Sequence, residues 1–185
     1  MRFNKHYDTE GKHAFMGASK YHWINYDLDK MERIWENKFA SEKGTRLHAL
    51  AAFCIRERVK LADNGTTLSL FVNDAIGFRM TPEQPFVYSD NSFGTADAAG
   101  FDGQVFRVHD LKTGEHPGKM EQNFVYCAYF CLEYRINPYN IRMLCRIYQY
   151  DDFIEVEADP KEIKRIMMKA KKFDKRIEEM KEVMG

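Results

Sequence analysis

The feature that most constrains the fold is an Asp102-Gly103 turn between two strand-like segments. Asp-Gly is among the strongest short signals for a two-residue β-hairpin, because such turns need residues that tolerate a positive φ. We therefore expect antiparallel strands over 95–101 and 104–112. In a two-residue turn Phe101 pairs with Gln104, and this pairing fixes the register of the whole hairpin.

Helical and strand-like patterns surround the hairpin in an order that predicts an α/β fold. Apolar residues at helical spacing predict helices around Trp23, from Asp27 or Asp29 through Trp35, over 42–60, from Thr66 or Thr67 through Ile76, over 119–134 and over 160–184. Further strands are expected over 86–88, 141–150 and 153–156. The 185 residues suit a single domain over 1–185, with a central mixed β-sheet flanked by helices.

Three charged residues of the hairpin are expected on one face of the sheet. Side chains alternate between the faces along a strand, so Asp110 and Lys112 share a face. Counting back through the turn places Asp97 opposite Val108 and on the same face, with Asp110 as its diagonal neighbour about 7–8 Å away. A register slipped by one residue would turn Asp97 to the other face.

The two carboxylates would repel each other in an apolar setting unless a cation compensates their charge. A divalent ion supplies that charge, and carboxylates at this spacing can converge on one ion. Lys112 could orient or deprotonate the attacking water and stabilise charge on a phosphate. The alternative is a surface hairpin that carries a solvated Asp/Lys pair.

Four further side chains are candidates for the same site. His48 lies on the 42–60 helix, where it is either a ligand for a metal such as Mn²⁺ or a structural histidine. Glu83 could add an outer carboxylate or be an ordinary loop acid. Gln122 and Tyr126 are four residues apart and thus share one helix face, where they could contact a phosphate or the lysine; a partly buried polar pair is the alternative.

Four short motifs follow one another between residues 44 and 126. They are Gly44-Thr45…His48, Gly94-Thr95-Ala96-Asp97, Asp110-Leu111-Lys112 and Gln122…Tyr126. In this order they resemble the motifs of the PD-(D/E)XK nuclease superfamily, specifically its RecB-type exonuclease branch. That branch includes CRISPR-associated single-strand exonucleases and small phage-encoded relatives. The resemblance implies a restriction-endonuclease-like sheet flanked by helices.

The resemblance also implies a metal-dependent DNA exonuclease in phage or bacterial DNA recombination or processing, acting on single strands or strand ends and leaving a 5′-phosphate. Mg²⁺ or Mn²⁺ would be held by His48, Asp97, Asp110 and the backbone carbonyl of Leu111, and Lys112 would position the nucleophilic water. Gln122 and Tyr126 would complete the catalytic set. An endonuclease or junction resolvase of the same fold is one alternative. A non-catalytic nucleic-acid-binding protein that kept the fold is another.

The cysteines do not follow the iron–sulfur pattern of that branch. Its iron–sulfur members carry one cysteine ahead of the histidine motif and a close C-terminal trio. Here Cys54 follows His48, Cys127 and Cys131 fall within the fourth-motif helix, and no cysteine lies beyond Cys145. We therefore expect no cluster, and thiols that are buried as small apolar groups.

The net charge is zero, with 28 basic and 28 acidic residues, so DNA binding must come from local patches. Arg46, Lys43 and Lys119 are candidates for such contacts. Basic residues of the C-terminal helix, Lys164 and Lys171 among them, are further candidates, but they alternate with acids, and this pattern favours a solvated helix face. The polar N-terminus and the lack of a long apolar run indicate a cytoplasmic protein without membrane contact, in the host cytoplasm if it is phage-encoded. Homo-oligomers occur among the relatives, but no motif here reports one.

Overall fold

A computed structural model of the chain describes residues 5, 7–9 and 11–184. The chain divides into two compact units, residues 1–43 and residues 44–185. Most of the polar N-terminal segment noted in the sequence lies outside the described residues. In the described part of the chain, no helix combines the length and the apolar character that a bilayer span requires.

The first unit holds two short 3-10 helices and the beginning of a long α-helix. The 3-10 helices are η1 (Tyr7–Thr9) and η2 (Ala18–Asn25), and the α-helix is α1 (Leu28–Arg56). Trp23, expected on a short helix, lies on η2 and donates its indole N–H to the Gly17 carbonyl at 3.2 Å. Phe15 and Trp35 pack edge to face with ring centroids 5.0 Å apart.

Helix α1 corrects one expectation about the chain. We expected separate helical segments through Trp35 and over 42–60, but α1 runs without interruption from Leu28 to Arg56. Glu36, Lys38 and Ala40 between the two patterns are good helix formers, and Lys38 pairs with Glu42 one turn later at 3.5 Å. Gly44 is the residue that most disfavours the helix there, at a cost of about 1 kcal/mol, which does not end it.

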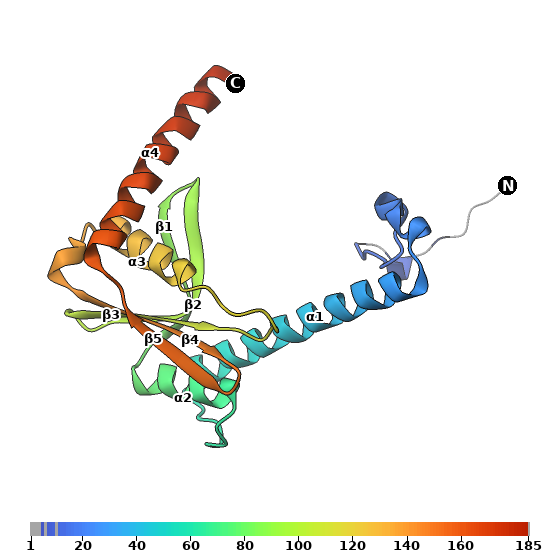
Figure 1. Cartoon of the computed structure of the whole chain (residues 1–185), viewed down its shortest axis with the longest axis horizontal. Helices are drawn as coiled ribbons and strands as arrows, with labels where there is room; N and C mark the ends of the chain where they lie inside the picture. The colour runs from blue at the N-terminus through green and yellow to red at the C-terminus, as the bar shows by residue number, and fades with distance from the viewer. Residues whose placement is uncertain (1–4, 6, 10, 185) are drawn as a thin grey trace. The chain divides into compact units, whose positions relative to one another are not determined.

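A five-stranded mixed sheet forms the centre of the second unit, as expected (Figure 1). Its strands follow in chain order: β1 (Thr81–Ser89), β2 (Ser92–Phe101), β3 (Val105–Leu111), β4 (Arg142–Gln149) and β5 (Asp152–Glu157). All neighbours are antiparallel except β3 and β4, which are parallel. Parallel neighbours need a crossover, and helix α3 (Glu121–Glu133) provides it.

The register of the β2–β3 hairpin differs from the two-residue turn that we expected. Phe101 pairs with Phe106, because the Asp102 carboxylate accepts hydrogen bonds from the Gln104 and Val105 amides at 3.0 and 2.7 Å and widens the turn. The prediction that Phe101 pairs with Gln104 is therefore wrong by two residues.

An error of two residues changes which residues are opposite but leaves every side chain on its face. The hairpin pairs Ala98 with His109, so its next step sets Asp97 opposite Asp110. The expected pairing of Asp97 with Val108 is wrong, since Val108 lies opposite Ala99. The two acids are direct neighbours across the strands instead of diagonal ones.

Helices cover both faces of the sheet and enclose two apolar cores. One core lies between the sheet and the helices α3 and α4 (Pro160–Met184). The other lies between the opposite face, α2 (Thr67–Gly77) and the end of α1. Figure 1 shows α2 and α3 on opposite sides of the strands. All four cysteines are buried and free, as expected for small apolar residues.

Candidate functional site

Asp97 joins three elements of the second unit. Its Oδ1 lies 3.0 Å from Nδ1 of His48 on α1, and its Oδ2 accepts a hydrogen bond from the Leu111 amide of β3 at 2.8 Å. The carboxylate beside the imidazole raises the pKa of His48, although partial burial of the ring opposes this effect. The first two motifs therefore meet at one carboxylate.

Gly44 explains the spacing of the first motif. It lies one turn before His48 on α1, at the point where the helix approaches the loop after β3. A Cβ at Gly44 would lie 2.8 Å from the Thr113 hydroxyl. A side chain at position 44 would force Thr113 to move, so glycine lets this turn of the helix, and with it His48, lie close to the loop without such a shift.

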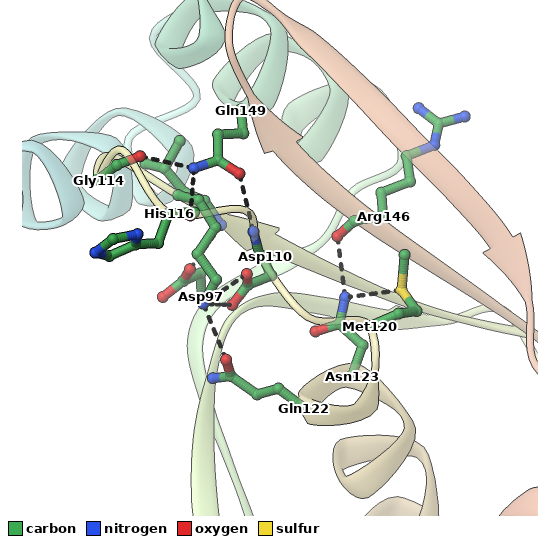
Figure 2. A network of polar contacts seen from close by, with 12 residues as sticks. Asp97, Asp110, Gly114, His116, Met120, Gln122, Asn123, Arg146 and Gln149 are labelled. Atoms are coloured by element: carbon green, nitrogen blue, oxygen red, sulfur yellow. Dashed lines mark hydrogen bonds and ion pairs between the residues drawn. The ribbon is translucent and has the colours of Figure 1, made fainter.

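Asp110 and Lys112 form a second pair beside the first. The Lys112 ammonium lies 2.8 Å from Oδ2 and 3.1 Å from Oδ1 of Asp110, whose side chain is only 4% exposed. Burial raises the pKa of Asp110, and the lysine partly offsets the rise. Figure 2 shows the two acids side by side, with Gln122 reaching toward them from α3.

The lysine is held from α3 by a chain of hydrogen bonds. Lys112 donates to the Gln122 carbonyl at 2.9 Å, and the Gln122 amide donates to the Tyr126 hydroxyl at 3.1 Å. The Tyr126 hydroxyl donates in turn to the Thr95 carbonyl of β2 at 2.7 Å. Gly94 leaves room for this ring, because a Cβ there would lie 3.0 Å from Tyr126 Cε1. The second, third and fourth motifs are thus joined in one network.

Gln149 braces the loop after Lys112 and is a residue that the sequence reasoning missed. Its amide donates to the carbonyls of Gly114 and His116 at 2.7 and 2.8 Å, and its carbonyl accepts from the Gly118 amide at 2.9 Å (Figure 2). The signal for it was weak: a polar residue at the end of an apolar strand. These three bonds fix the path of the loop that carries the lysine.

Gly118 closes this loop against the lysine stem. A Cβ at Gly118 would lie 2.9 Å from both Lys112 Cγ and Ile147 Cγ2. Ile147 is buried and β-branched, so its Cγ2 has little freedom to move. The stem of Lys112 is therefore confined between the loop and β4.

Glu83 does not join this network. It lies on the edge strand β1 with φ +48°, and its exposed carboxylate pairs with Arg56 at 3.3 Å. A non-glycine residue rarely adopts this left-handed conformation, which indicates local strain of about 1–3 kcal/mol.

The donor atoms of the network suit a hard divalent cation. Among the described residues, no group of three or more His, Cys, Asp or Glu side chains is arranged to hold a metal. His48 and Asp97 bond to each other, and Asp110 bonds to Lys112. The chemistry of the set nevertheless fits, because carboxylate oxygens and one imidazole suit Mg²⁺ or Mn²⁺. Asp110 Oδ2 is buried, and apart from its ion pair it has no hydrogen bond within the described part of the chain.

The predicted DNA contacts are exposed residues. Arg46 lies on α1 and Lys119 just before α3, while Lys43 belongs to the first unit. Two of the candidate cations of the C-terminal helix form a basic grouping with a third cation. Lys164 and Lys171 of α4 line a pocket of about 350 Å³ together with Arg135 at the end of α3. We name it the cationic pocket.

A second polar cluster lies on the opposite face of the sheet. His109 is 1% exposed and its Nδ1 lies 3.2 Å from the Tyr148 hydroxyl, which donates to Asp74 of α2 at 2.8 Å. Arg146 donates to the same Asp74 oxygen at 2.7 Å. Burial and the nearby guanidinium of Arg146 lower the pKa of His109 to about 3. This cluster ties α2 to β3 and β4.

Comparison of the chain with protein-family models, with curated proteins and with solved structures finds no match.

Proposed function

We propose that the chain is a metal-dependent nuclease that hydrolyses phosphodiester bonds in DNA, acting as an exonuclease. One observation carries the proposal: the Lys112 ammonium is held 2.8 Å from the Asp110 carboxylate and 2.9 Å from the Gln122 amide oxygen, beside a second acid, Asp97. A buried acid beside a half-buried one, with a fixed lysine, has no evident role in packing. It suits a reaction in which negative charge develops on a phosphate.

Each residue has a role that follows from its contacts. Lys112 can hold the attacking water with one N–H, because an ammonium has three donors and the other two are directed by Asp110 and Gln122. Tyr126 fixes Gln122 and so keeps the lysine from rotating away. His48 orients Asp97 through its 3.0 Å contact.

A divalent cation would be held by His48, Asp97, Asp110 and the backbone carbonyl of Leu111. Bound there, it would supply Lewis-acid activation of the phosphate and a lower pKa for the attacking water. Asp97 would reach the cation from β2 and Asp110 from β3, so each strand would contribute one negative charge.

Digestion of DNA labelled at its 5′ or 3′ end tests the proposal. Single- and double-stranded substrates are incubated with Mg²⁺, Mn²⁺ or a chelator. We expect label to be released from ends, with cation only. Lys112→Ala should abolish release while DNA binding persists, and Lys161→Ala, which removes an exposed lysine at the start of α4, should change nothing. Internal fragments would indicate an endonuclease or resolvase instead. No cleavage with either cation, in a protein that binds DNA, would leave only a binding function.

A further inference from the structure

An apolar pocket of about 300 Å³ lies beside the C-terminal end of α3. We name it the aromatic pocket, because Phe86, Phe101, Phe106, Phe130 and Tyr134 line it. Pockets of this size and lining are typical of sites for small, flat apolar groups.

The rings divide into a floor and a mouth. Phe106 and Phe130, which are 1% and 5% exposed, stack in parallel with centroids 4.0 Å apart and form the floor. Phe101 and Tyr134 are 42% and 53% exposed, yet each packs against Phe130 at 5.2 and 5.1 Å. Two exposed aromatic rings in contact with a buried one offer a surface on which another planar ring can stack.

The aromatic pocket lies on the same strands and the same sheet face as the candidate site. Phe101 is four residues beyond Asp97 on β2, and Phe106 is four residues before Asp110 on β3. At about 3.3 Å per residue, each step is about 13 Å. The two sites are also adjacent along helix α3, because Phe130 of the aromatic pocket follows Tyr126 of the candidate site by one turn of the helix. A short single-stranded segment can cover this distance.

The charge next to the aromatic pocket favours a phosphate-bearing ligand over a neutral apolar one. The cationic pocket shares Ile136 with the aromatic pocket. The cationic pocket is lined by Arg135, Lys164 and Lys171. Among the described residues, no carboxylate lines it, and none of these three cations forms an ion pair. Unpaired cations beside aromatic rings are what a single-stranded nucleic acid requires.

We propose that the aromatic pocket binds an unpaired base of the substrate strand and that the cationic pocket holds a phosphate of the same strand. This inference rests on the proposed function and assigns to it a contact that would distinguish unpaired from paired strands. A paired base cannot enter, because both of its faces are covered in the duplex. The base would stack against Phe101 and Tyr134, which needs no particular sequence.

Fluorescence anisotropy in the presence of a chelator tests this site without cleavage. Three probes are compared: a single-stranded oligonucleotide, the same oligonucleotide with a central run of abasic nucleotides, and a blunt duplex. We expect the abasic strand and the duplex to bind about 5- to 150-fold more weakly, the range for loss of one stacked base. Tyr134→Ala should weaken the single strand to a similar degree, and Tyr134→Phe should not, since the ring alone stacks.

Tyr139→Ala is the matched control, because Tyr139 is 60% exposed and lines neither pocket. Lys171→Ala should reduce the slope of log affinity against log salt by about 1. Equal binding of the abasic strand, or no effect of Tyr134→Ala, would overturn the inference. If the base dependence is found but no DNA is cleaved with Mg²⁺ or Mn²⁺, the proposed nuclease function fails and the base site stands.

Discussion

Replacing Lys112 by methionine is the most direct test of how the acid pair is stabilised. Methionine keeps most of the stem and removes the ammonium, so the Asp110 carboxylate, only 4% exposed, is left without its cation. Removing one partner of a buried ion pair costs about 3–5 kcal/mol. We expect the lower value, about 3 kcal/mol, because the lysine itself is 28% exposed and water screens part of the pair.

The double variant separates this effect from lost packing. Asp110→Asn together with Lys112→Met leaves no buried charge, so it should be more stable than Lys112→Met alone. Urea unfolding at pH 8 with a chelator, followed by circular dichroism, gives the free energy of unfolding for the four proteins of the cycle. We expect a coupling energy of about 2 kcal/mol between the two positions.

Additive losses would refute this reasoning, because they would mean that the two side chains do not interact in solution. Mn²⁺ supplies an independent readout. If Asp110 is a ligand, added Mn²⁺ should raise the unfolding midpoint of Lys112→Met, since a cation then compensates the charge that the lysine no longer balances. The Asp110→Asn/Lys112→Met protein should respond less.

Three further outcomes are expected. Gly118→Ala should lower the free energy of unfolding by about 1–3 kcal/mol and reduce turnover, because its Cβ would lie 2.9 Å from Lys112 Cγ. Gly114→Ala is the control, because the added carbon has no atom within 4 Å. Equal stability of the two variants in thermal unfolding would contradict this prediction. The pKa of His109 is about 6.5 in the unfolded chain but about 3 in the folded protein. As the pH falls between these values, the free energy of unfolding should decrease by up to about 1.4 kcal/mol per pH unit. Urea titrations at several pH values should show a weaker dependence on pH for His109→Gln. Tyr126→Phe removes a 2.7 Å hydrogen bond to a β2 carbonyl and should cost about 1–3 kcal/mol by thermal melting; an unchanged melting temperature would argue that water already satisfies that carbonyl.

The strands and most helices could be predicted because residues close together in the sequence determine them: apolar spacing, turn residues and helix caps. Asp159 accepts a hydrogen bond from the Lys161 amide at 2.9 Å, so the predicted helix start at 160 is confirmed. The continuity of α1 was not predicted, because residues 36–41 separate two apolar patterns and add no apolar stripe of their own. Local factors continue the helix there, among them the ion pair of Lys38 with Glu42 one turn later.

The residues of the candidate site could be predicted as a set, but their connections could not. Alternation along the strands placed Asp97, Asp110 and Lys112 on one face, and the structure brings them together with His48. Which residue pairs with which depends on the hairpin register and on rotamers, which local spacing does not determine. Gln149 was missed because its partners are backbone groups of a loop, and these leave no mark in the sequence.

The turn at 102–105 has a consequence for altering this protein. Residues added at the tip only lengthen the loop as long as Phe101 keeps its pairing with Phe106. A slip of β3 by one residue past β2 would instead turn Asp110 and Lys112 to the opposite face of the sheet. The tip can therefore accept a probe or a longer loop, provided that the pairing of β2 with β3 is kept.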